Sequence, residues 1–320
     1  MKTSSSPSAT RVFGLGLLCA AGLLAAGALA PRWLTSLATL ALANGLVSLG
    51  IVVMMRTGVV PFGQGLVFAT GGYAAALLFN FAGVTDLLVL TATGAVAALV
   101  LAAPFAPLLA RYRGIFFAML TLALSMVLYG LLMKTQSLGG SDGFNTGRPT
   151  LLGWRAPDAH AHLLLWGVTA TVACLAAGLA RLYFDSQRGL LSLGVRENEL
   201  RVEYLGSSVP SLVASNFLIA AAMGGAGGAL AVMALGHIDP NFSYWTTSGE
   251  FVFVAILAGH HSVVAVFVGS LLLELVRSFS SAYFPNTWQL AMGVFLLLVI
   301  RFLPDGLGSL ALRRRTGSTA

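Results

Sequence analysis

Stretches without a single charged residue recur along the chain, and charged residues gather between them. Ten such stretches follow one another: 12–30, 33–55, 57–85, 87–110, 114–133, 163–180, 206–236, 251–259, 262–273 and 288–300. A helix needs about 20 mostly apolar residues to cross the hydrocarbon core of a bilayer, and most of the stretches are about that long. The pattern therefore predicts an all-α polytopic integral membrane protein.

The last three stretches decide how many helices cross the membrane. Residues 251–259 are too short to span it alone, because a helix rises about 1.5 Å per residue. We expect this helix to extend upstream through Tyr244 and Trp245, and a tight cytoplasmic turn to follow near His260. The total is then about ten membrane helices, some of them broken, with both chain ends in the cytoplasm.

Basic residues agree with this topology, because Lys and Arg are more frequent in cytoplasmic loops than in external ones. The topology places on the cytoplasmic side Arg56, Arg111, Arg113, Arg181, Arg188, Arg196 and Arg201, and on the external side Arg32, Lys134, Arg148, Arg155 and Arg277. The alternative for Arg277 is a side chain that snorkels to either interface.

The chain then divides into a cytoplasmic tail at 1–11, one transmembrane domain at 12–310 and a basic cytoplasmic tail at 311–320. A cleavable signal peptide is the alternative for the N-terminus, because basic residues precede an apolar stretch that ends in Ala28-Leu29-Ala30. Pro31 would be a poor first mature residue, and the stretch is long for a signal peptide. We therefore expect the first helix to be retained.

Composition excludes a soluble fold, since 57% of the 320 residues are hydrophobic and 9% are charged, against about 25% charged in soluble domains. The net charge of +7 comes from basic residues that stand singly between apolar stretches. We therefore interpret them as topology signals and expect no nucleic-acid binding. Cys19 and Cys174 lie inside apolar stretches, so we expect neither a disulfide nor a metal site.

A cytoplasmic loop at about 184–208 is the most informative polar segment. Ser186 can cap a helix and Gly206 can end one, while Leu200 and Tyr204 lie four residues apart on one helical face. The loop is either a plain connector or a docking element for a soluble partner. Because a connector needs only a few residues, we favour docking, through Arg196, Glu197, Glu199, Leu200, Arg201, Tyr204 and Gly206, with Glu197 and Arg201 as an i,i+4 ion pair.

Several segments, in order, resemble one known family. Residues 196–206, Arg-Glu-Asn-Glu-Leu-Arg-Val-Glu-Tyr-Leu-Gly, resemble the coupling loop of branched-chain amino-acid ABC permeases, as do the preceding residues 187–193. The resemblance spans roughly residues 40–310 and includes Pro61 to Gly65 with Gly71 to Ala75, Arg113 to Ala123, Gly139 to Gly143, and Phe302 to Leu307. Two segments depart from the family pattern, Ala258 to Ser262 and Gly65 to Phe68, and these leave the transported solute open.

The resemblance implies a subunit that has no catalytic residues and binds no cofactor or metal. ATP would be bound by separate ABC ATPase subunits, since the chain lacks a phosphate-binding Gly-x-x-x-x-Gly-Lys-Ser/Thr motif. Further implied partners are a second permease, identical or different, and a periplasmic or lipid-anchored substrate-binding protein. The implied location is the bacterial inner membrane, amid lipid. The implied solute is a branched-chain amino acid or a related small amide or carboxylate.

The third stretch contains residues typical of a broken membrane helix. Pro61 and several glycines surround Gln64, and irregular backbone at membrane depth usually lines a cavity or packs against protein. Thr121 and Ser125 lie four residues apart on a later helix. The candidate pathway residues are Gly63, Gln64, Gly65, Thr121 and Ser125. The alternative is close helix packing, with the hydroxyl groups bonded back to their own helix.

Ser141, Asp142 and Gly143 are candidates for contact with the external substrate-delivering partner, although a plain Asp-Gly turn is the commoner explanation of such a sequence. The adjacent His260 and His261 point in diverging directions on a helix, so we interpret them as an interfacial turn. Glu250 and Glu274 are functional suspects because acids in membrane segments usually are.

Two other functions compete with an import permease. An ion-coupled secondary transporter predicts charged residues deep in the spans, and most of the long stretches have none. A membrane enzyme predicts a cluster of His, Asp or Glu at one face of the membrane, for which only His260, His261 and nearby acids qualify.

Overall fold

The computed structural model describes residues 9–155, 157, 160–259, 262–285, 287–302 and 306–308. His260, His261 and nearly all of both expected tails lie outside these residues. The described long helices are α1 (Ala9–Leu29), α2 (Arg32–Met55), α3 (Gln64–Ala82), α4 (Leu87–Ala102), α6 (Gly114–Lys134), α7 (Ala161–Asp185), α10 (Val209–Leu235), α11 (Trp245–Ala258), α12 (Val263–Tyr283) and α13 (Trp288–Phe302).

Shorter elements connect the long helices. They are the helices α5 (Ala106–Leu109), α8 (Gln187–Glu197) and α9 (Glu199–Tyr204), the 3-10 turns η1 (Gln136–Leu138) and η2 (Pro240–Ser243), and the strands β1 (Phe144–Asn145) and β2 (His237–Ile238). Six described helices are long and apolar enough to cross a membrane, and four further apolar helical segments are shorter. This pattern confirms the all-α polytopic class.

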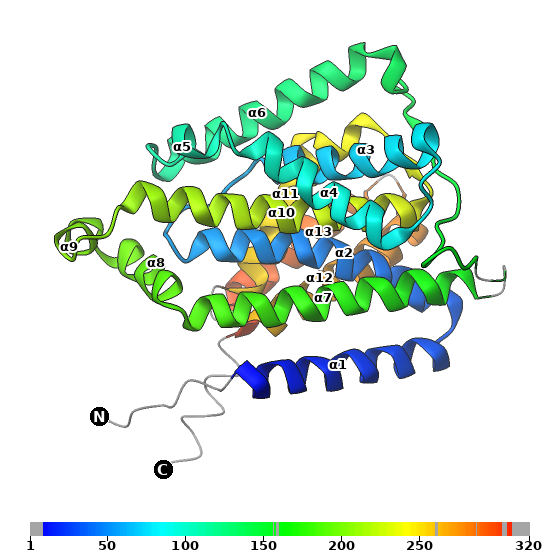
Figure 1. Ribbon diagram of the computed structural model, residues 1–320, viewed down its shortest axis with the longest axis horizontal. Helices are drawn as coiled ribbons and strands as arrows, with labels where there is room; N and C mark the ends of the chain where they lie inside the picture. Colours follow the sequence, from blue (N-terminus) through cyan, green and yellow to red (C-terminus); the bar gives the residue numbers. More distant parts are fainter. Residues whose placement is uncertain are drawn as a thin grey trace.

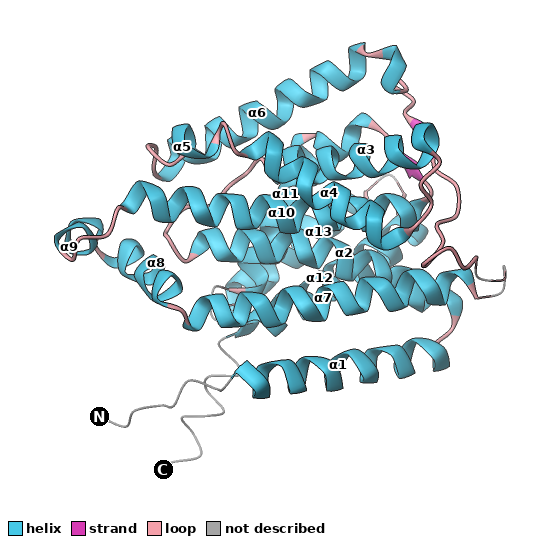
Figure 2. Cartoon of the chain, viewed as in Figure 1, coloured by secondary structure: helices cyan, strands magenta, loops and turns pink. Residues whose placement is uncertain are grey.

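The long helices lie side by side in one bundle (Figure 1). The helices α8 and α9 project beyond one end of it, which we call the hairpin end. The two antiparallel strands lie at the opposite end, which we call the strand end (Figure 2). The two ends of the bundle therefore differ: one has the two short helices α8 and α9, and the other has the two short strands.

The helix α10 is the centre of the bundle, where it packs against α2, α3 and α4. Its glycines make these contacts close: a Cβ atom at Gly225 would overlap the Gly94 carbonyl of α4, and one at Gly228 would overlap the Phe68 carbonyl of α3. Small residues let helix backbones approach in a membrane, where dispersion forces rather than water drive association.

The structure confirms one sequence-based expectation in part and corrects two. The third stretch begins with irregular backbone at residues 57–63, as expected around Pro61 and Gly63, but Gly65, Gly71 and Gly72 lie inside the continuous helix α3. The fourth stretch, 87–110, is not one helix, because α4 ends at Ala102 and α5 follows after a turn.

The second correction concerns α12, which does not end at Leu273 but continues to Tyr283. Glu274 and Arg277 are therefore part of a long apolar helix, and Arg277 lies six residues before its end rather than in a loop. The expected segment stopped at Leu273 because the charged residues Glu274 and Arg277 follow it. Arg277, however, pairs with Glu250 of α11 at 3.0 Å, and such pairing makes charged residues tolerable inside a membrane helix.

The two ends of the bundle give a direct test of the topology. In a chain with Cys19→Ala and Cys174→Ala, a membrane-impermeant maleimide added to intact cells should label Leu152→Cys at the strand end. It should label Glu203→Cys at the hairpin end only after the membrane is permeabilised, because the hairpin end is expected to be cytoplasmic. Both positions are solvent-exposed. Labelling of Glu203→Cys in intact cells would overturn the topology.

Candidate functional site

The loop at the hairpin end folds as two short helices rather than one. The Ser186 hydroxyl caps α8 by accepting a hydrogen bond from the Gly189 N–H at 3.3 Å. Asn198 then leaves the helical conformation, with φ −161° and ψ 105°, and its side chain accepts from the Arg201 N–H at 3.1 Å. Gly206, at φ +80°, adopts the left-handed conformation after α9. The expected continuous charged helix is thus a helical hairpin, α8–α9.

The break at Asn198 corrects the expected ion pairing. Glu197 ends α8 and Arg201 lies in α9, so the two residues are not an i,i+4 pair of one helix, and they form no ion pair with each other in the part of the chain described. Glu199 instead pairs with Arg113 at 2.6 Å. Because Arg113 also donates to the Ala110 carbonyl at 2.6 Å, this pair ties the hairpin tip to the turn between α5 and α6.

Polar contacts also join α8 to the bundle. The Asn216 amide of α10 donates to the Ser192 hydroxyl at 3.1 Å and its oxygen accepts a bond from the Tyr183 hydroxyl of α7. Arg56 lies 4.2 Å over the Phe184 ring and donates to the Gly189 carbonyl at 3.5 Å. These contacts link α8 to α2, α7 and α10 and so anchor the hairpin to the core.

Burial lowers the pKa of the Arg56 guanidinium, and the Asp185 carboxylate opposes that shift. Arginine remains charged in proteins, so the cation is fixed beside α8. Arg196 of α8 makes a second contact with the region after α2, because the aliphatic part of its side chain lies against Gly58.

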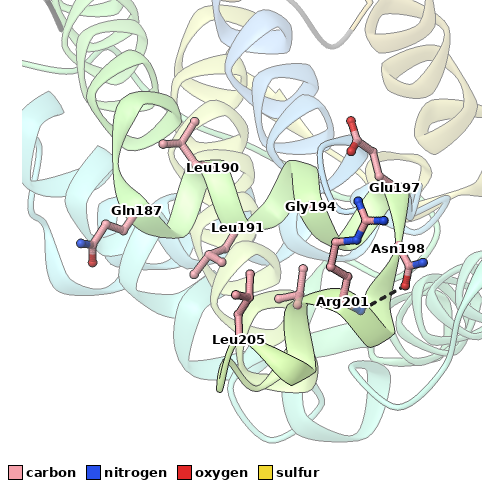
Figure 3. Close-up of a pocket in the computed structure, with 9 residues that line it drawn as sticks. Gln187, Leu190, Leu191, Gly194, Glu197, Asn198, Arg201 and Leu205 are labelled. Carbon is pink, nitrogen blue, oxygen red and sulfur yellow. Dashed lines mark hydrogen bonds between the residues drawn. The ribbon is translucent and has the colours of Figure 1, made fainter. Parts of the chain in front are cut away.

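A cleft of about 430 Å³ lies between α8 and α9. Its lining is largely apolar, with Leu190, Leu191 and Leu205 at its walls and Glu197 and Arg201 at its edge (Figure 3). Four apolar side chains of the hairpin are exposed: Leu190 by 58%, Leu200 by 63%, Tyr204 by 88% and Leu205 by 73%. Exposed apolar groups gathered next to a cleft are typical of an interaction site.

The expected pathway residues come together at the start of α3. Gly63 lies so close to α6 that a Cβ atom there would overlap the Thr121 carbonyl. The Thr121 hydroxyl accepts from the Phe62 N–H at 3.2 Å and donates to the Ala118 carbonyl. Gln64 is 1% exposed, and its side-chain oxygen has no hydrogen-bond partner.

Two residues that the sequence analysis missed complete this cluster. The Gly65 N–H donates to the Ser248 hydroxyl at 2.9 Å, and the Ser125 hydroxyl donates to the Ser243 carbonyl at 2.7 Å. Both serines are fully buried and flank the start of α11. The cluster thus joins α3, α6 and α11 by tight packing, and its role in a solute pathway stays a prediction.

The external-contact residues lie at the strand end. Gly143 adopts φ +66° and lies against the Ile238 carbonyl of β2, where a Cβ atom would overlap it. Ser141 and Asp142 are exposed and hydrogen-bond each other at 3.0 Å. The turn interpretation therefore accounts for Gly143, and the exposed pair remains available to a partner.

Comparisons with known proteins agree on one family. A family model described as the permease component of the branched-chain amino acid transport system matches residues 33–303. The high-affinity branched-chain amino acid transport system permease protein LivM of Escherichia coli (strain K12) is 26% identical over 306 residues, which cover 86% of this chain and 70% of LivM. LivH of the same strain is 28% identical over 145 residues, 45% of this chain and 46% of LivH. No solved structure matches the chain.

The Asn198 cap predicts a local effect that can be measured without transport. Asn198→Ala should speed amide hydrogen exchange in Glu199–Tyr204 about fivefold, because a lost N-cap costs about 1 kcal/mol. Asn198→Asp is the matched control, since Asp caps equally well. Unchanged exchange in Asn198→Ala would show that the cap does not hold α9.

Proposed function

The chain belongs to the permease family of branched-chain amino acid transport systems, and from this we propose that it is the membrane-spanning subunit of an ATP-driven importer in the bacterial inner membrane. Separate ATPase subunits hydrolyse ATP and bind the chain at the hairpin end. A second permease completes the membrane assembly. Two permease proteins, LivM and LivH, both resemble this chain, which supports such a pair.

The α8–α9 hairpin is the observation that carries the proposal. It projects beyond the bundle, exposes Leu200 and Tyr204, and contains an apolar cleft. A loop that only connected α7 to α10 would need neither two capped helices nor exposed apolar side chains. An ATPase surface that fills the cleft and covers Tyr204 would bury this apolar area from water.

The same hairpin would transmit the ATPase movement. Nucleotide binding draws the two ATPases together and moves the docked hairpins as rigid levers. Since Ser192 is bonded to Asn216 of α10 and Glu199 to Arg113 before α6, a shift of the hairpin would move both α10 and α6. The packed contact between Gly63 and Thr121, which joins α3 to α6, would then open or close the solute path.

At the strand end, Ser141 and Asp142 contact the substrate-binding protein that delivers the solute. The solute is a branched-chain amino acid or a related small amide or carboxylate, in line with the transport system named for LivM. Such a contact is polar and exposed, as expected for a partner that binds and leaves in each cycle.

Glu250, Glu274 and Arg277 favour a second candidate, an ion-coupled secondary transporter. They are ionisable residues within membrane helices, the feature that such a transporter needs. Family membership argues for ATP as the energy source, and the charged cluster then requires another explanation within an importer.

Hairpin docking predicts that Glu197→Ala combined with Tyr204→Ala abolishes uptake. An exposed aromatic that fills a partner's pocket contributes about 2 kcal/mol or more, roughly a thirtyfold loss of ATPase affinity when it is removed. The measurement is co-purification of the ATPase with the tagged double variant, together with uptake of radiolabelled leucine into vesicles.

The matched control is Trp154→Ala, which removes an exposed aromatic at the strand end and should leave ATPase co-purification unchanged. Membrane insertion of the double variant is checked by its yield in the membrane fraction. Normal co-purification with normal uptake would mean that the hairpin is only a connector.

A further inference from the structure

A cavity of about 290 Å³ lies among α2, α3, α10, α11 and α12. Residues of η2 contribute to its lining, which places the cavity toward the strand end. Its polar lining includes Asn44 of α2, Asp239 beside η2, Glu250 of α11, and Glu274 and Arg277 of α12, and Phe68 and Phe251 supply apolar walls. Ligand pockets usually combine such apolar walls with a few converging polar groups.

Three of the charged groups of this cavity, Glu250, Glu274 and Arg277, lie inside long apolar helices, whereas Asp239 precedes η2. Trp245 and Tyr283 begin α11 and end α12 at the strand end and are exposed there, as expected for aromatic residues at a membrane interface. Glu250 lies about 7.5 Å along the helix axis from Trp245, and Glu274 about 13.5 Å from Tyr283, at about 1.5 Å rise per residue. Glu274 is therefore the deeper of the two.

The two carboxylates are held differently. Glu250 pairs with the Arg277 guanidinium at 3.0 Å. Glu274 accepts one long hydrogen bond, from the Asn44 amide at 3.4 Å, and forms no ion pair of its own among the described residues. Three carboxylates and one guanidinium line the cavity, so an excess of negative charge faces it.

A carboxylate inside a membrane span is unfavourable unless a cation or several donors stabilise it. Glu274 has one weak hydrogen-bond donor, and the nearby Arg277 guanidinium that attracts it is already paired with Glu250. Its carboxylate also lines a cavity. A ligand that brings a cationic hydrogen-bond donor would give Glu274 a direct ionic partner of its own. A primary ammonium group does this with three N–H donors.

We propose that this cavity binds the ammonium group of the transported solute, with Glu274 as its principal acceptor. Glu250, held by Arg277, adds negative potential beside it, and the guanidinium lies near enough to attract the solute's carboxylate. Phe68 and Phe251 contact the aliphatic part. A cavity of this volume, at the small end of ligand pockets, fits one amino acid. The inference rests on the proposed import function, which it deepens by assigning the permease a recognition site for α-amino acids.

Direct binding tests the site without ATP hydrolysis. The permease assembly is placed in lipid nanodiscs without binding protein, and radiolabelled L-leucine binding is measured by scintillation proximity. Two competitors dissect the ligand: 3-methylbutylamine has the ammonium but no carboxylate, and 4-methylpentanoate has the carboxylate but no ammonium. We expect the amine to displace leucine and the acid to be far weaker. Glu274→Gln should weaken leucine binding at least about tenfold through loss of a charged hydrogen bond.

Glu203→Gln, the same change in exposed α9, is the matched control and should bind leucine normally. Competition on the unmodified protein keeps the test valid if Glu274→Gln folds poorly. The proposal is overturned if wild-type protein does not bind leucine, if the acid competes as well as the amine, if sodium ions compete as well as the amine, or if a well-folded Glu274→Gln binds normally.

ATP-driven leucine uptake by the complete importer separates this inference from the proposed function. Unimpaired, ATP-dependent uptake by Glu274→Gln would sink the cavity assignment and leave the import function intact. Ammonium-dependent binding in nanodiscs without any ATP-driven uptake would sink the import function and leave the site.

Discussion

Close backbone contact between α10 and its neighbours is the constraint on which the other helices depend. Gly225 and Gly228 lie against carbonyl groups of α4 and α3, with no room for a Cβ atom at either position. In a bilayer such packing replaces the hydrophobic effect as the force between helices. Since α10 also contacts α2, the positions of α2, α3 and α4 are all set by α10. The remaining elements pack around these four helices.

The hairpin, the cluster at the start of α3 and the cavity at the strand end are all positioned by this core. The hairpin follows α7 and leads into α10, and Asn216 bonds it to the central helix. The glycine-rich start of α3 lies against α6 at Thr121, while Glu250 and Arg277 join α11 to α12 around a cavity at the strand end. Force applied at the hairpin would therefore act on helices that border both the cluster and the cavity.

The sequence predicted those features that a single segment determines. The lack of charge marks the helices, and Pro61 and Gly63 predicted the irregular backbone before Gln64, whereas Gly65, Gly71 and Gly72 lie within an unbroken helix. The sequence did not predict where α12 ends. Arg277 is tolerated inside the membrane because it pairs with Glu250, and Glu250 lies 27 residues away in the sequence. The break at Asn198 was also missed, although Asn is a favoured N-cap residue, because the i,i+4 spacing of Glu197 and Arg201 favoured one helix through this segment. Ser243 and Ser248 join the pathway cluster only through tertiary contacts.

The most direct test of the proposed import function is to measure which energy source drives uptake. The chain is reconstituted into proteoliposomes with a second permease, the ATPase subunits and the substrate-binding protein, and leucine uptake is followed with ATP or with an imposed proton or sodium gradient. The account predicts uptake that needs ATP and the ATPase and ignores both gradients. Gradient-driven uptake by the permease chains alone, without ATPase, would contradict it.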